Sequence, residues 1–189
     1  MTTDDQATSK AKLDRSISLF WANVLSILWI APLMLLFVPL YSILWGAGAA
    51  QSGLAAFMGN PITFLLLFGG GIVAHEVLHG LTWQWRLGRR GVVEYGVKWR
   101  LLTPYAHLKQ PVSAADYRIA TWMPGVVVGF APMLVGLFIG LRALFWFGIL
   151  FTWAAGGDML VLWQLRGVPG SAKVEDHPSR AGCYVYQEQ

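Results

Sequence analysis

Four long apolar runs, separated by short polar segments, dominate the pattern of hydrophobic and polar positions along the chain. They cover residues 17–45, 61–85, 119–141 and 143–165. A helix needs about 20 mainly apolar residues to cross the hydrocarbon core of a bilayer. The pattern therefore predicts an α-helical integral membrane protein with four transmembrane helices.

The first and last runs need further interpretation. Lys10, Lys12 and Arg15 precede the first run, as in a signal peptide, but signal cores span roughly 7–15 residues and this run is about twice as long. We therefore interpret it as a membrane helix. The fourth run is interrupted by "GGD" at 156–158, and only Arg142 separates it from the third. The third and fourth helices should therefore form a tight hairpin.

The segments between the runs differ in kind. Residues 86–117 hold short runs of Val, Tyr, Trp and Leu with partial alternation and turn residues between them, which predicts two or three short strands, a small β-hairpin or sheet between helices 2 and 3. The tail 167–189 ends in a strand-like "CYVY" that could pair with it, while 46–60 is an uncharged loop. The chain thus divides into a polar tail 1–15, a four-helix domain 16–166 and the tail 167–189.

Charge sets the expected orientation. If the N-terminus is cytoplasmic, thirteen of the fourteen basic residues fall on the cytoplasmic side and only Arg142 falls outside. The thirteen are Lys10, Lys12, Arg15, Arg86, Arg89, Arg90, Lys98, Arg100, Lys109, Arg118, Arg166, Lys173 and Arg180. Cytoplasmic loops are enriched in Lys and Arg. We therefore expect a multi-pass protein of a prokaryotic plasma membrane, with both termini and the strand region 86–117 in the cytoplasm.

Composition supports a lipid environment. The chain is 56% hydrophobic and only 13% charged, whereas soluble domains are about 25% charged. The net charge of +4 comes from basic residues placed as topology signals, so we expect the bilayer and no nucleic acid as a partner. The single cysteine, Cys183, rules out an internal disulfide framework and leaves the redox compartment open.

Two acids and two histidines interrupt the apolar runs, and three of these four residues lie within "HEVLH" at 75–79. An ionisable group in a span costs about 2.5–3.5 kcal/mol on insertion scales and marks function by default. His75 and His79 are four residues apart, so on a helix their imidazoles share a face and can converge on one metal ion. Glu76 flanks that ion without ligating it, which suits a general base.

The second acid, Asp158, is the expected third metal ligand. His79 lies seven residues before Arg86, and Asp158 lies eight residues before Arg166. Both helices run toward the cytoplasm, so at about 1.5 Å per residue both groups lie roughly 10–12 Å below the same surface. A catalytic zinc takes three protein ligands and keeps one position open. Zn²⁺ is the expected cofactor, although iron or cobalt would also fit two imidazoles and a carboxylate.

Other interpretations of these residues stay open from sequence alone. The motif could form a buried hydrogen-bonded cluster that links helices. Asp158 could cap a broken helix or pair with a protonated histidine. His107 and His177, in the expected cytoplasmic segments, have the setting of ordinary surface or loop histidines.

With these residues in hand, the chain resembles a family of integral membrane zincin peptidases of unknown function, and it looks like a reduced relative of the site-2 proteases. The resemblance covers roughly 60–186 and rests on "HEVLHG" at 75–80, "DYRIATWMPGVVVG" at 116–129, "GGDM" at 156–159 and "VEDHPSRAGCYVY" at 174–186. It implies zinc held by His75, His79 and Asp158, with Glu76 as general base. Site-2 proteases usually carry an N-x-x-D-G motif. Here the sequence is "AAGGDML", which has no Asn at the motif position before Asp158 and has Met159 in place of the Gly after it.

The leading hypothesis is a zinc-dependent intramembrane endopeptidase that hydrolyses a peptide bond of a membrane-embedded or membrane-associated protein substrate. Its substrate would have to unwind and could add as a strand to the predicted cytoplasmic strands. The alternative is a non-catalytic membrane protein with a structural or transported metal ion. An inactive relative used as a scaffold is a third possibility, which the intact motif disfavours.

Overall fold

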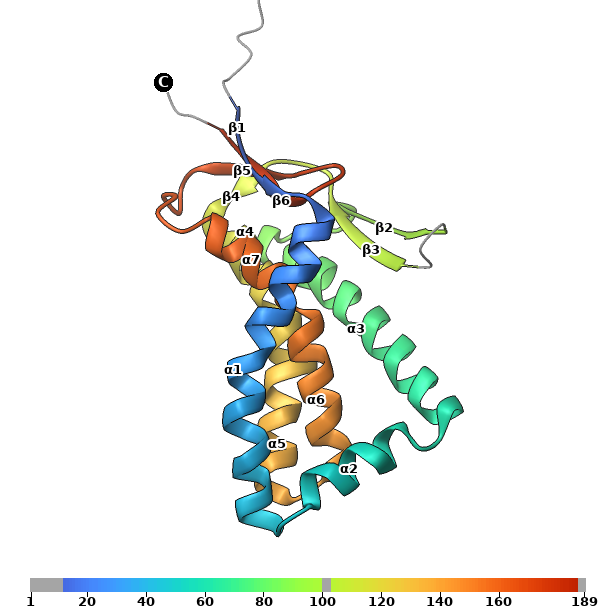
Figure 1. Cartoon of the computed structure of the whole chain (residues 1–189). Helices are drawn as coiled ribbons and strands as arrows, with labels where there is room; N and C mark the ends of the chain where they lie inside the picture. Colours follow the sequence, from blue (N-terminus) through green and yellow to red (C-terminus); the bar gives the residue numbers. More distant parts are fainter. Residues whose placement is uncertain (1–11, 100–102, 187–189) are drawn as a thin grey trace, which may run out of the picture.

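In the computed structural model, which describes residues 12–99 and 103–186, the strands gather beyond one end of a group of long helices (Figure 1). We call this the strand end. The helices are α1 (Leu19–Trp45), α2 (Ala49–Met58), α3 (Pro61–Leu87), α4 (Ala114–Pro124), the π-helix η1 (Gly125–Phe130), α5 (Ala131–Ile139), α6 (Arg142–Ala154) and α7 (Gly156–Gln164). The strands are β1 (Lys12–Ile17), β2 (Val93–Lys98), β3 (Thr103–Leu108), β4 (Val112–Ser113), β5 (Lys173–Asp176) and β6 (Ala181–Tyr186).

Within the described residues, four helical stretches are long and apolar enough to cross a membrane, which confirms the predicted number. They are Leu19–Trp45, Pro61–Leu87, Ala114–Ile139 and Arg142–Gln164. The third begins at Ala114 rather than at 119 because the Ser113 hydroxyl caps it, accepting a hydrogen bond from the Asp116 amide at 3.1 Å. The fourth is broken at Ala155, next to the "GGD" interruption.

The loop predicted for 46–60 contains a helix instead. Its sequence is rich in alanine, which favours helix, and its Ala50, Gly53 and Phe57 are buried on one face. The indole N–H of Trp146 in α6 donates to the Ala50 carbonyl at 2.9 Å. These buried positions recur every three or four residues, as expected for one face of a helix.

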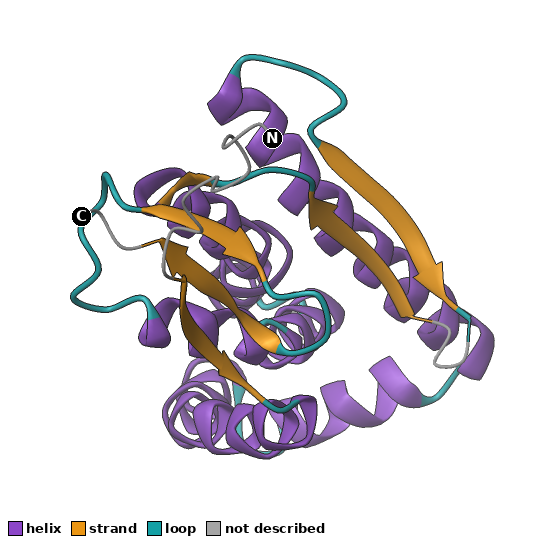
Figure 2. Ribbon diagram, turned by 90° about the horizontal axis from the view of Figure 1, so that it is seen from above, coloured by secondary structure: helices purple, strands orange, loops and turns teal. Residues whose placement is uncertain are grey.

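The strand end is more extensive than the predicted hairpin, because both ends of the described chain join it. An antiparallel sheet has the order β1-β6-β5-β4, in which Lys12 pairs with Tyr186 and Val112 pairs with Val174 (Figure 2). The predicted polar tail 1–15 is therefore strand from residue 12 onward, and its first eleven residues lie outside the described part. The charged side chains of this segment favoured the prediction of a polar tail, but charged side chains are also common on an edge strand.

Strands β2 and β3 form a separate antiparallel hairpin that lies along α3 (Figure 2). Gly80, directly after the second histidine of the motif, allows this contact. A Cβ at Gly80 would overlap the hydroxyl end of the Tyr95 ring from β2. The glycine of "HEVLHG" thus brings the hairpin down onto the helix that carries the motif.

Two buried clusters hold the molecule together. One, at the strand end, joins the sheet to α3, α4 and α7 and includes Leu108, Tyr117 and Val174. The other joins α1, α2, α5 and α6 around Met133 and Phe145. Outside them the long helices expose large apolar side chains to their surroundings, as transmembrane helices do. Away from the strand end, α3 leans away from α1, α5 and α6, and α2 spans the interval (Figure 1).

Candidate metal centre

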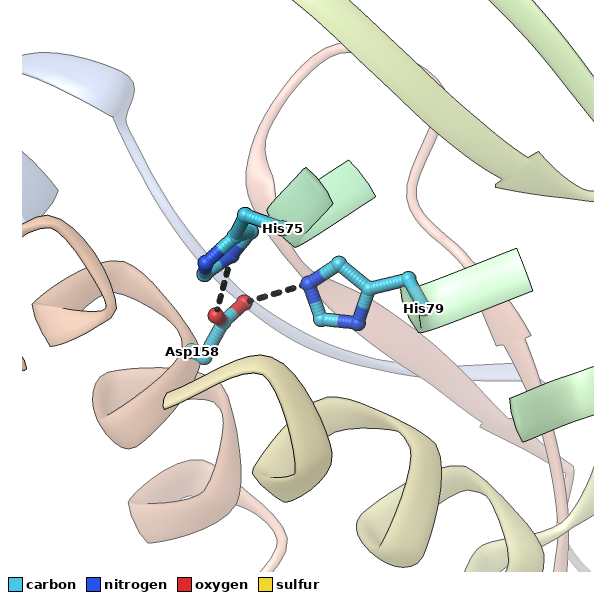
Figure 3. A group of neighbouring side chains, drawn as sticks. All are labelled: His75, His79 and Asp158. Carbon is cyan, nitrogen blue, oxygen red and sulfur yellow. Dashed lines mark ion pairs between the residues drawn. The ribbon is translucent and has the colours of Figure 1, made fainter. Parts of the chain in front are cut away.

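The two histidines of the motif and the aspartate of α7 meet at one point near the strand end (Figure 3). His75 and His79 are buried one turn apart on α3, with ring centroids separated by 4.9 Å. His75 Nε2 lies 3.0 Å from Asp158 Oδ2, and His79 Nε2 lies 3.4 Å from Asp158 Oδ1. One nitrogen or oxygen atom from each residue lies within 4.8 Å of the others. The structure thus brings together all three residues that the sequence nominated as metal ligands.

The ring of His79 is held in one orientation. Its Nδ1 lies 2.9 Å from the carbonyl oxygen of Ala120 in α4, and the ring stacks on Trp83 at 5.7 Å between centroids. Because a carbonyl oxygen only accepts, Nδ1 carries the hydrogen in this contact and Nε2 keeps its lone pair. A backbone partner of this kind typically orients a metal-binding histidine. The free lone pair faces Asp158.

The contacts of Asp158 also fit a cation. In the described part of the chain, neither Asp158 Oδ2 nor His75 Nδ1 makes a hydrogen bond of normal geometry, although both atoms are buried. Buried polar atoms without partners are rare and call for an explanation, such as an ion. Two imidazoles and a carboxylate are also the donor set of several catalytic zinc sites. These three residues could therefore hold zinc, with room for a further ligand on the cavity side.

A break in the fourth long helix places Asp158. α6 ends at Ala154, and α7 begins at Gly156, so the aspartate lies in the first turn of α7, where the helix dipole favours an anion. Gly156 packs directly on α1, where a Cβ would overlap the backbone and side chain of Ser26. Gly157 has open space around its Cα. The close packing of Gly156 on α1 therefore fixes the position of the Asp158 carboxylate along the helices.

The side chain of Glu76 reaches strand β3. Its Oε2 accepts a hydrogen bond from the backbone N–H of Ala106 at 2.9 Å. The sequence suggests Glu76 as a general base but gives no sign of this contact, since the contact joins a helix to a strand through a main-chain group.

Two of the candidate ligands, His79 and Asp158, line a cavity of about 550 Å³. Its lining includes Glu76, His79 and Asp158, together with residues of β3 and of the turn between β5 and β6. His107 and His177, which the sequence left as ordinary loop residues, both line it. His177 has a structural task as well, because its Nδ1 accepts the backbone N–H groups of Ser179 and Arg180 and so shapes the turn.

Sequence reasoning missed Asp176, which ties three elements together at the cavity. Its Oδ1 accepts from the Tyr117 hydroxyl at 2.5 Å, and its Oδ2 accepts from the Leu108 amide at 2.9 Å. His107 Nδ1 lies 3.5 Å from the same Oδ2. Burial raises the pKa of Asp176 above its usual value, while these donors oppose the shift. Its place among charged residues in "VEDHP" gave no sign of this burial.

Comparison with protein families identifies the chain. A family model described as "Putative zincin peptidase" matches residues 68–173, which is more than half of the chain and includes all four candidate site residues. The chain belongs to this family. Zincins are zinc peptidases, so membership implies zinc as the cofactor and metallopeptidase activity. Comparisons with curated proteins and with solved structures give no significant match.

Proposed function

We propose that this zincin-family protein is a zinc-dependent intramembrane endopeptidase that hydrolyses a peptide bond of a membrane-associated protein substrate. The observation that carries the proposal is the convergence of His75, His79 and Asp158 beside Glu76, inside helices long enough to cross a bilayer. The three ligands would hold zinc between α3 and α7. The relation to the site-2 proteases belongs to the same proposal and rests on the sequence resemblance.

Each residue of the proposed centre has a separate role in peptide-bond hydrolysis. Bound zinc would supply a Lewis acid that lowers the pKa of a water molecule to near 7 and polarises the scissile carbonyl. Glu76, next to His75 but not part of the ligand set, would take the proton of the attacking water and pass it to the leaving amine. Asp158 would balance part of the charge of a bound ion, and the Ala120 carbonyl keeps the lone pair of His79 Nε2 directed toward Asp158. A peptide segment would reach these groups through the cavity that Glu76, His79 and Asp158 line.

The proposed topology puts the strand end in the cytoplasm. The described basic residues other than Arg142 lie on the strands or at the ends of the long helices nearest to them, which supports this orientation under the positive-inside rule. His79 lies eight residues before Leu87 at the end of α3, or about 12 Å along the helix. The centre would thus lie within the bilayer's cytoplasmic half, and the substrate would reach it in extended form.

Substitution of Glu76 tests the proposal. E76Q should keep its zinc and lose about 100-fold or more in the hydrolysis rate of a fluorogenic peptide, as removal of a general base does. The measurement uses the full chain in detergent, with zinc determined by mass spectrometry. The rival function, a structural or transported metal ion, predicts no hydrolysis by the wild-type protein and no effect of E76Q on zinc. Wild-type hydrolysis that survives E76Q would contradict the role of Glu76.

A further inference from the structure

Strand β3 has one paired edge and one open edge. The Lys109 amide, one residue past β3, donates to the Val92 carbonyl at 2.9 Å, so odd-numbered residues turn their N–H groups toward β2. Backbone groups alternate along a strand, so the even-numbered residues turn theirs away from β2. The open edge therefore consists of Pro104, Ala106 and Leu108.

Carboxylates occupy the two N–H groups of this open edge. Ala106 donates to Glu76 Oε2 and Leu108 donates to Asp176 Oδ2, each at 2.9 Å. Pro104 has no N–H to donate. Between Pro104 and Leu108 the described edge thus presents carbonyl groups to an incoming peptide. It presents no unoccupied N–H donor.

The edge also borders the candidate centre. Ala106 and His107 line the same cavity as Glu76 and Asp158, and Pro178 and Arg180 of the β5–β6 turn line it as well. An extended peptide in this cavity would run close to β3. To pair with Ala106 as a neighbouring strand does, the peptide must offer a carbonyl oxygen to the N–H that Glu76 occupies.

We propose that Glu76 closes the open edge of β3 in the substrate-free protein, and that an extended peptide opens it by replacing Glu76 at the Ala106 amide. This exchange rests on the proposed function. One N–H···O bond breaks and one forms, so the carboxylate is released only when a peptide backbone is in place. Glu76 then turns its free oxygen to the water that it deprotonates.

The two carboxylates differ in how firmly they are held. In the described part of the chain the Ala106 amide is the only hydrogen-bond donor to Glu76. Asp176 also accepts the Tyr117 hydroxyl and lies beside His107. Displacing Asp176 would therefore break more contacts than displacing Glu76. The edge opens at Ala106, and Leu108 stays closed as the end of the peptide-binding stretch.

A binding measurement tests the exchange without requiring turnover. The probe is a fluorescein-labelled decapeptide of alternating Thr and Val residues, titrated by anisotropy into the zinc-loaded full chain. Gln at position 76 keeps an oxygen that accepts the Ala106 N–H, whereas Ala leaves that N–H free. E76A should therefore bind the probe about fivefold more tightly than E76Q, since a neutral hydrogen bond contributes about 1 kcal/mol. E94A, which removes a cavity carboxylate on β2, is the matched control and should bind like the wild type.

A double-mutant comparison assigns the effect to the amide. A106P removes the N–H without touching the ladder to β2, and on this background E76A and E76Q should bind the probe equally. Should A106P fail to fold, the E76A and E76Q pair still decides. Equal binding by E76A and E76Q in the otherwise wild-type chain overturns the exchange, even if the wild-type protein proves to be a peptidase. Tighter binding by E76A without any wild-type hydrolysis would support the exchange and refute the peptidase function instead.

Discussion

His79 Nε2 lies 3.4 Å from Asp158 Oδ1, which joins the long helix α3 to the first turn of the short helix α7. The Ala120 carbonyl fixes the tautomer of His79, so the two facing atoms are both electron-pair donors. Such atoms repel each other unless a proton or a cation lies between them. Substitution of His79 or Asp158 is therefore a direct test for a metal ion at this site.

Removal of either member of this pair should strongly weaken zinc binding. We expect H79A and D158A each to lower zinc affinity by more than about 100-fold, beyond the 10- to 100-fold typical of changes to residues that only orient a ligand. Competition with a fluorescent chelator on the purified protein measures this. H107A, a histidine of the same cavity outside the ligand set, should keep its zinc. Full zinc binding by D158A would remove Asp158 from the ligand set.

The two glycines before Asp158 should respond differently to the same substitution. A Cβ at Gly156 would overlap Ser26 of α1, so G156A should push α7 outward and cost about 1–3 kcal/mol in the free energy of unfolding. A Cβ at Gly157 would meet no neighbouring heavy atom within 4 Å, so G157A should be neutral or slightly stabilising. Thermal unfolding in detergent, with and without zinc, compares them. Equal losses in both variants would contradict the packing of α7 on α1.

The sequence predicted the candidate ligands because their geometry follows from helix periodicity. A separation of four residues brings His75 and His79 to one face of a helix. Counting residues from the expected cytoplasmic ends of the two helices predicts the same depth for Asp158. The partners of the site were not predictable in this way. Ala106 meets Glu76 through a backbone amide, and Asp176 meets Tyr117 across the fold. Contacts of this kind depend on how the strands are placed over α3, and no local pattern records that placement.

Orientation in the membrane gives a further prediction. On a C183A background, Q51C in α2 and S171C between α7 and β5 place single exposed thiols at opposite ends of the molecule. In intact cells a membrane-impermeant maleimide should label Q51C and should label S171C only after the membrane is opened. The reverse pattern would place the strand end outside and would invert the proposed topology.

The thiol of Cys183 should make the fold sensitive to alkaline pH. Burial in β6, assisted by the nearby Asp176 carboxylate, raises the pKa of Cys183 from 9.0 to about 12. The folded chain then holds this proton more tightly than the unfolded chain does. The resulting stability is fully present below about pH 9 and is lost as the pH rises toward 12. The loss is about 1 kcal/mol per pH unit within that window.

Thermal unfolding midpoints from pH 8 to 10.5 should therefore fall more steeply for the wild type than for C183A, which shares every other titrating group. Parallel slopes would show that the thiol is as accessible to solvent in the folded chain as in the unfolded one.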